Sequence, residues 1–240
     1  MKRQIIALGG GGFAFGAAKP LIEEYILRQS LQDNPKVCFI GTASGDQDQL
    51  IRDFYDTFRL LGASPADLSL FGEPPKDLTA FLCAQHVVYV GPGWARNLSV
   101  LWKEWSLDIA LRTAWEQGVI LAGVSAGSVC WYEEGLTMWH PPSELGVLHG
   151  LGLLIGSQCP HYNREVRRET FHRLLLENRI SPGIGIEDDV AIHYSDNEII
   201  RCVSTRTEGK AFRVSVGNGE IVEEPLLVDL LSKNVTTPHA

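Results

Sequence analysis

Residues 119–127 read Val-Ile-Leu-Ala-Gly-Val-Ser-Ala-Gly, a short apolar run that ends in two glycines around a serine. The apolar residues predict a buried strand, and residues 128–132 can begin a helix. Gly-x-Ser-x-Gly between a strand and a helix is typical of a nucleophile elbow, in which Ser125 stands on a tight turn above the sheet. Glycine suits positions 123 and 127 because a side chain there would clash with neighbouring backbone. The alternative is an ordinary glycine-rich turn with a capping serine.

Apolar runs alternate with helical patterns on both sides of this stretch. We expect strands at residues 4–8, 37–40, 68–71, 86–90 and 119–122, and helices at 19–28, 48–61 and 96–116. Strands that alternate with helices favour a parallel sheet with helices on both faces. The sequence therefore predicts an α/β fold with a doubly wound, mostly parallel sheet.

The last third of the chain is predicted to contain short strands in place of this alternation. They are expected at residues 183–186, 190–194, 198–203, 210–216 and 220–223, with turn residues between them. We interpret them as a C-terminal antiparallel extension that packs on the same domain. Residues 1–231 are thus expected to form a single α/β domain, and residues 232–240 a polar, frayed tail.

A serine needs an adjacent base to act as a nucleophile, and His161 is the best candidate among seven histidines. It follows the apolar run at 151–155, so we expect it at the carboxyl end of a strand, on the same sheet edge as Ser125. Two other histidines fall in a helical or strand pattern and are expected to be structural, and two in a Pro/Gly-rich stretch stay open: His172 and His193, and His140 and His149.

The acid that would orient the imidazole is less sharply defined. No Asp lies between Ser125 and His161. Glu187 ends a strand-like run, and Asp188 and Asp189 follow it directly. Any of these carboxylates could hold an imidazole in one tautomer and stabilise its cation, and each could equally be an acid that solvates a turn. The residues alone leave the three alternatives open.

Two further glycine loops follow predicted strands. The loop at 91–97 reads Gly-Pro-Gly-Trp-Ala-Arg-Asn and should neighbour the Ser125 turn, so the Gly93 amide could be a second oxyanion donor. The four glycines at 9–12 lack the Lys and Ser/Thr of a P-loop, and no acidic residue ends the second predicted strand. The sequence therefore argues against dinucleotide binding there.

The composition narrows the class of protein. Apolar residues make up 45% and charged residues 21% of the 240 residues, which is typical of a folded globular chain. The 21 basic and 29 acidic residues give a net charge of −8, which disfavours a nucleic-acid binder. No apolar run is long enough to predict a membrane span. Five widely spaced cysteines without a C-x-x-C pair predict reduced thiols in a cytoplasmic protein rather than a zinc site.

The motifs occur in one order: glycines at 9–12, Thr-Ala-Ser-Gly-Asp at 42–46, the glycine loop at 91–93, Gly-Val-Ser-Ala-Gly at 123–127, Pro-His-Tyr at 160–162 and Gly-Ile-Glu-Asp at 185–188. Over residues 4–203 this order resembles the peptidase E family, which includes aspartyl dipeptidase and, more distantly, cyanophycinase. The resemblance implies a class I glutamine-amidotransferase-like sandwich and a cofactor-free serine exopeptidase of small peptides. It also implies roles: Ser125 as nucleophile, His161 as base, Glu187 as acid, and Gly93 and Ala126 as oxyanion-hole residues.

The sequence departs from the family pattern near the expected substrate. The family loop usually reads Gly-Gly-Gly-Asn-Thr, whereas here Pro92 lacks an N–H and Trp94 and Ala95 replace polar residues. Specificity for an N-terminal Asp therefore stays open, since a bound Asp side chain would need a cation. The candidate cations are Arg96, Arg164, Arg167 and Arg168, and the expected substrate-binding residues are Trp94, Arg96 and Arg164.

These observations together predict a cytoplasmic serine peptidase of small peptides, a monomer or homodimer without a metal, a cofactor, or a nucleic-acid or membrane partner. One alternative is an esterase-like acyl hydrolase, in which the chain order would be Ser, acid, His. Another is a catalytically altered, ligand-binding member of the same fold, which the Pro92 and Trp94 substitutions would favour.

Overall fold

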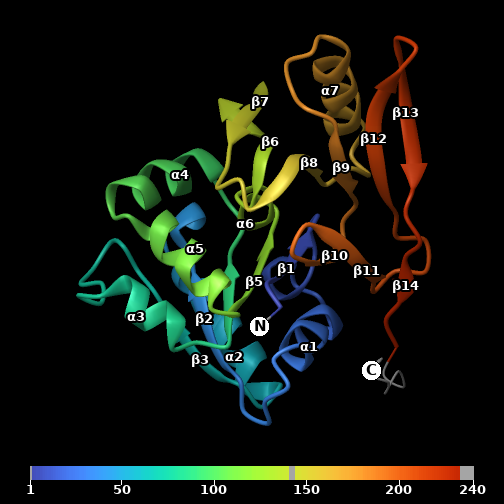
Figure 1. The fold of residues 1–240 in the computed structure, drawn as a ribbon. Coiled ribbons are helices and arrows are strands. Elements are labelled where there is room, and N and C mark those ends of the chain that lie inside the picture. The colour runs from blue at the N-terminus through green and yellow to red at the C-terminus, as the bar shows by residue number, and fades with distance from the viewer. Residues whose placement is uncertain (1, 141–143, 233–240) are drawn as a thin grey trace.

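A computed structural model describes residues 2–140 and 144–232 and shows two β-sheets with helices packed against them (Figure 1). The first sheet has the order β14-β11-β10-β1-β5-β4-β2-β3. Within it β1, β5, β4, β2 and β3 run parallel, as the sequence predicts for this part of the chain. Its strands are β1 (Gln4–Leu8), β2 (Lys36–Ile40), β3 (Ser64–Asp67), β4 (Val87–Val90), β5 (Ile120–Val124), β10 (Val190–Ser195), β11 (Glu198–Ser204) and β14 (Asp229–Leu230).

The second sheet has the order β13-β12-β9-β8-β6-β7. Its central strands β6, β8 and β9 run parallel, and antiparallel strands flank them on both sides. The strands are β6 (Tyr132–His140), β7 (Glu144–His149), β8 (Leu154–Pro160), β9 (Gly183–Ile186), β12 (Ala211–Gly217) and β13 (Glu220–Pro225). The chain therefore has a mixed α/β fold with two sheets rather than one.

Helices cover both faces of the first sheet because its strands are apolar on both sides. In β1, Ile5 and Ala7 join the core formed with α3, α4 and α5, whereas Ile6 and Leu8 join the core formed with α1 and α2. Helix α7 packs on the second sheet beside β12 and β13 (Figure 1). The helices are α1 (Leu21–Arg28), α2 (Asp48–Leu60), α3 (Leu78–Cys83), α4 (Ala95–Glu104), α5 (Leu107–Glu116), α6 (Ala126–Val129) and α7 (Glu165–Leu176), with 3-10 turns η1 (Phe13–Phe15) and η2 (Thr42–Ser44).

Two predicted elements in the first half are wrong in detail. The helix expected at 96–116 is two helices, α4 and α5, because Ser106 has a φ of 53° and interrupts the helical backbone. The spacing of apolar residues does not indicate this break. Ile109 is exposed, although the single-helix pattern places it on the buried side. The strand expected at 68–71 lies earlier, at β3. Leu68 and Leu70 are buried but follow the end of β3, and the Leu68 amide makes one further hydrogen bond to the sheet, to the Phe39 carbonyl of β2 at 2.8 Å.

The prediction for the last third is corrected in its topology. The short strands exist, but β9, β12 and β13 belong to the second sheet, whereas β10 and β11 extend the first. We did not predict the antiparallel pair β6 and β7, and His140 and His149 each lie at the end of a strand rather than in a loop. The predicted polar tail at 232–240 falls almost entirely outside the described residues.

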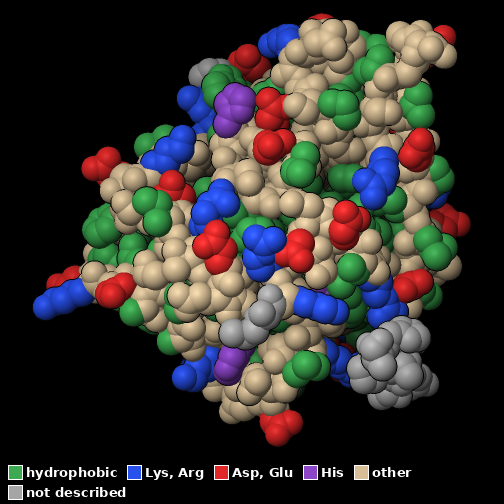
Figure 2. Space-filling model, in the orientation of Figure 1, with side chains coloured by type: hydrophobic (Ala, Val, Ile, Leu, Met, Phe, Trp, Pro, Cys, Tyr) green, Lys and Arg blue, Asp and Glu red, His purple; other side chains and the backbone are tan. Residues whose placement is uncertain are grey.

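Across the described ranges, the helices are all too short or too polar to cross a lipid bilayer. On the face drawn in Figure 2, Lys and Arg side chains are interspersed with Asp and Glu side chains rather than gathered in one basic area.

Candidate active site

Ser125 lies on the tight turn between β5 and α6, with a φ of 55° and a ψ of −111°. This backbone conformation is rare for a residue with a side chain, so the surrounding structure must hold it. A Cβ on Gly123 would overlap the Gly127 carbonyl, and one on Gly127 would overlap the Val90 carbonyl. Helix α6 spans only Ala126–Val129, so it starts two residues earlier than we expected and ends before Tyr132, where β6 begins. The two glycines therefore let the turn close tightly around the serine.

His161 comes from the second sheet, directly after β8, and not from the sheet that carries Ser125 as we expected. Its Nε2 lies 2.8 Å from Ser125 Oγ. Its backbone is also left-handed, with a φ of 54°, and its amide donates to the Gly9 carbonyl at 3.2 Å. The residue is 4% exposed. The imidazole is thus held against the serine from the neighbouring sheet.

Asp188 lies on the other side of the imidazole, where its Oδ1 contacts His161 Nδ1. Asn163 fixes the carboxylate with two hydrogen bonds: its Nδ2 donates to Oδ2 at 3.1 Å, and its Oδ1 accepts from the Asp188 amide at 3.0 Å. Arg164 Nε lies 3.8 Å from Oδ2. Burial alone would raise the pKa of Asp188, but His161, Asn163 and Arg164 outweigh burial and lower it to about 2.

The ionised state of Asp188 assigns the proton on the imidazole. A carboxylate can only accept hydrogen bonds, so Nδ1 of His161 carries a proton and Nε2 is the acceptor for the Ser125 hydroxyl. Burial lowers the pKa of His161 below its ordinary value of 6.5, and Asp188 only partly opposes this effect. The imidazole is therefore neutral at neutral pH, which is the form that can take a proton.

Glu187 does not contact His161, which corrects the acid that the family resemblance implied. Its Oε2 accepts hydrogen bonds from Arg206 Nη2 at 2.9 Å and from the Lys210 amide at 3.1 Å. Successive residues of extended chain point to opposite sides, so only one of the neighbours Glu187 and Asp188 can face the imidazole. The structure places Asp188, one of the alternatives left open, at that position.

The four glycines at 9–12 form the floor of the site. A Cβ on Gly10 would lie 2.6 Å from His161 Nδ1 and would overlap Asp188 Oδ1. The Gly9 carbonyl accepts from the His161 amide, and the Gly10 carbonyl accepts from the Asp189 amide at 3.0 Å. Gly10 is a glycine because His161 and Asp188 lie directly on its backbone, whereas a Cβ on Gly9 would overlap the Glu187 carbonyl and one on Gly11 would overlap Asp189 Oδ1. The sequence indicated that this run is not a P-loop, but it did not predict that these glycines pack beneath His161 and Asp188.

The two predicted oxyanion-hole residues follow different strands: Gly93 lies in the loop after β4, and Ala126 lies at the start of α6, after β5. Ala126 is the first residue of α6, a position whose amide has no acceptor within the helix. Gly93 has a φ of 139°, and a Cβ there would overlap the Ala43 carbonyl. The Trp94 amide donates to this same carbonyl at 2.7 Å, so it anchors the loop rather than facing a substrate.

The three predicted substrate-binding residues have different surroundings. Trp94 is 40% exposed and immediately precedes α4. Arg96 stacks on Trp139 at 4.1 Å from the ring centre and donates to its carbonyl at 2.9 Å, so protein groups already engage its guanidinium. Arg164 makes no hydrogen bond through its guanidinium to the residues at 2–140 and 144–232, and only its long ion pair to Asp188 is present.

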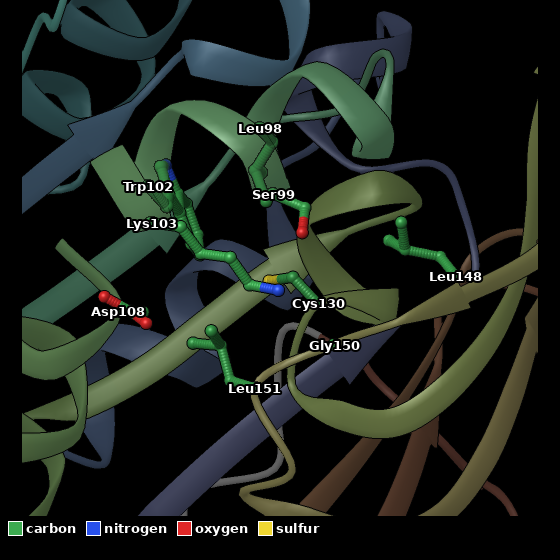
Figure 3. Close-up of a pocket in the computed structure, with 9 residues that line it drawn as sticks. All are labelled: Leu98, Ser99, Trp102, Lys103, Asp108, Cys130, Leu148, Gly150 and Leu151. Carbon is green, nitrogen blue, oxygen red and sulfur yellow. The ribbon is translucent and has the colours of Figure 1, made fainter. Parts of the chain in front are cut away.

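A small pocket between α4, α5 and the end of α6 does not belong to this arrangement (Figure 3). The space in it for the centre of a water molecule is about 10 Å³, which is about what a single water requires. Its lining is mostly apolar and includes Trp102, Cys130 and Leu151. It is too small for a peptide.

Comparisons with known proteins agree on one family. The model of peptidase family S51 matches residues 5–202. The uncharacterized peptidase YgaJ of Bacillus subtilis (strain 168) is 45% identical over 230 residues, which is 95% of this chain and 99% of that protein.

Two crystal structures are similar in fold at lower identity. A peptidase from an acI-B1 Actinobacterium matches with a TM-score of 0.67 and 16% identity over 95% of both chains. A protein from Listeria monocytogenes EGD-e that is proposed to be a peptidase E matches with a TM-score of 0.60 and 19% identity, over 83% of this chain and 98% of that one. The extent of the family match and the identity to YgaJ show that this chain is a peptidase and belongs to peptidase family S51.

Proposed function

We propose that this protein is a serine exopeptidase of small peptides that uses Ser125, His161 and Asp188 as a catalytic triad. The observation that carries the proposal is the 2.8 Å contact between Ser125 Oγ and His161 Nε2, with Nδ1 of the same imidazole on the ionised Asp188. A base within hydrogen-bond reach of the hydroxyl, itself oriented by a third group, is the arrangement that activates a serine.

The proposed reaction proceeds in two halves. Ser125 Oγ attacks the scissile carbonyl while His161 Nε2 takes its proton, and the Ala126 and Gly93 amides stabilise the oxyanion. His161 then gives the proton to the leaving amine, and an acyl-enzyme remains. Water, activated by the same imidazole, hydrolyses the acyl-enzyme and restores the hydroxyl. Asp188 stabilises the imidazolium in both halves without accepting its proton.

Arg164 supports the exopeptidase part of the proposal. It lies three residues after His161, and its guanidinium keeps donors that the residues at 2–140 and 144–232 do not use. A planar guanidinium can hold a carboxylate with two parallel hydrogen bonds. We propose that Arg164 binds the terminal carboxylate of a short peptide beside the imidazole. An internal segment of a long chain lacks this carboxylate.

Two alternatives from the sequence receive less support. In an esterase of the α/β-hydrolase type, the acid precedes the histidine, whereas Asp188 follows His161 in the chain. A purely ligand-binding role would not require a serine hydroxyl, an imidazole and a carboxylate in hydrogen-bonded sequence. The peptidase proposal therefore explains more of the site.

A panel of di- and tripeptides, read by mass spectrometry, tests the proposal. It should include Asp-X, Met-X and aromatic-X peptides, and peptides with blocked N- or C-termini. We expect Ser125→Ala to lower kcat by at least about 10⁴-fold, with Ser99→Ala, at the small separate pocket, as the matched control. A requirement for a free terminus would establish an exopeptidase. Cleavage that persists unchanged in Ser125→Ala would refute the proposed nucleophile.

A further inference from the structure

The 3-10 turn η1 carries two phenylalanines with opposite surroundings. Phe13 is 5% exposed, and its ring contacts Phe39 at 6.1 Å and Tyr89 at 5.3 Å between ring centres. Phe15 is 49% exposed, although an apolar ring of this size is ordinarily buried. Phe13 therefore anchors the turn in the core, and the same anchor holds Phe15 outward at the surface.

Phe15 lies directly against the imidazole of the proposed base. Its ring centre is 5.8 Å from that of His161, with an interplanar angle of 68°, which is the edge-to-face arrangement that aromatic rings favour. The imidazole also contacts Ser125 Oγ and Asp188 Oδ1, and it lies so close to Gly10 that a Cβ there would be 2.6 Å from Nδ1. Phe15, which is 49% exposed, therefore contributes exposed apolar surface beside the proposed base.

The chemistry of peptide hydrolysis identifies what this surface meets. His161 gives its proton to the leaving amine, so that amine must face Nε2. The residue attached to the amine then lies beside the imidazole, whereas the oxyanion points the other way, toward the Ala126 and Gly93 amides. Phe15 packs against this same imidazole, so its exposed surface is available to the leaving residue.

We infer that Phe15 is a specificity-determining residue that selects peptides whose leaving residue has an apolar side chain, such as leucine, methionine or phenylalanine. The inference rests on the proposed function and adds the class of leaving residue to it. An apolar side chain laid on the exposed part of the ring removes both surfaces from water. An acidic or amide side chain laid on the ring would lose hydration without gaining a hydrogen bond from Phe15.

The experiment compares kcat/KM for peptides with one fixed first residue, taken from the panel above, and Gly, Ala, Leu, Phe or Asp as the second. In the wild type we expect kcat/KM for Leu and Phe peptides to exceed that for the Gly peptide by about 10-fold. This is the lower end of what apolar contacts in binding sites contribute, because Phe15 is only partly exposed. Phe15→Ala should bring the Leu:Gly ratio to within about 2-fold, and Phe15→Leu should keep most of it.

Two controls separate specificity from structure. Phe71→Ala removes another exposed phenylalanine, in the stretch after β3 at the far edge of the first sheet, and should leave the ratio unchanged. Labelling of Ser125 by a fluorophosphonate, which has no leaving residue, should proceed in Phe15→Ala within about 3-fold of the wild-type rate, since the triad is intact.

The outcomes are distinguishable. A wild type that cleaves peptides equally well whatever the leaving residue, or a Phe15→Ala variant that lowers all substrates by the same factor, overturns the inference and leaves the proposed peptidase standing. Absence of cleavage of every peptide by a wild type that is still labelled at Ser125 overturns the proposed function, and the inference with it.

Discussion

Replacement of Gly10 by alanine should disable the site without touching any residue proposed to react. The new Cβ would lie 2.6 Å from His161 Nδ1, whereas ordinary contact begins at 3.4 Å. The imidazole would have to retreat by about 0.8 Å, and Asp188 by more, because its Oδ1 is closer still. A displacement of about 1 Å in a reacting group can cost about 10²-fold in rate. We therefore expect kcat/KM of Gly10→Ala to fall by about 10²-fold.

The backbone has little freedom to relieve this clash. Gly10 follows β1, which is paired on both sides, and its carbonyl accepts from the Asp189 amide. The assay is kcat/KM on the best peptide, together with the rate of fluorophosphonate labelling and a thermal unfolding curve. Gly72→Ala is the matched control, since the nearest atom to its Cβ would be 4.0 Å away. A folded Gly10→Ala protein with activity within about 3-fold of wild type would refute the reasoning.

Three further predictions concern charge at the site. Asp188→Asn should lower kcat by about 10³–10⁴-fold because the imidazole loses its orienting anion. Glu187→Gln should leave kcat within a few-fold of the wild-type value, and the reverse order of effects would identify Glu187 as the acid. The profile of kcat/KM against pH should stay flat down to below pH 6.5 and fall on further acidification, because burial lowers the pKa of His161 and only the neutral imidazole acts as a base. A profile that is flat only above pH 7 would contradict this prediction. Arg164→Gln removes a positive charge that lowers the pKa of His161, so the acidic limb of that profile should move to higher pH. Arg173→Gln is the control and should not move it, because the Arg173 guanidinium pairs with Glu177.

The sequence predicted the parts of this protein that depend on local pattern. The strand and helix alternation of the first half and the glycines around Ser125 follow from short-range spacing and turn chemistry. The contact of His161 with Ser125 was expected too, but from the same sheet, whereas His161 comes from the second sheet. The break between α4 and α5 did not, because the apolar period continues across Ser106 while the backbone changes direction there.

Features that depend on contacts distant in sequence could not be predicted. The assignment of β9 and β10 to different sheets follows from pairing with β8 and β1, which no local pattern encodes. The choice between Glu187 and Asp188 depends on which side of a three-residue link faces the imidazole. The role of Gly9, Gly10 and Gly11 also depends on residues distant in sequence, since His161 and residues 186–189 lie directly on them.

The proposed triad draws on both sheets, and this has a consequence for how the protein loses activity. Ser125 belongs to the first sheet and His161 to the second, while Asp188 lies in the link where the chain crosses from β9 back to β10. Any partial opening that separates the sheets would break the hydrogen-bonded relay while leaving most secondary structure in place. Under gradual heating or denaturant, catalysis should therefore disappear before the circular dichroism signal does. Turnover would act as an early reporter of whether the two halves of the molecule remain docked.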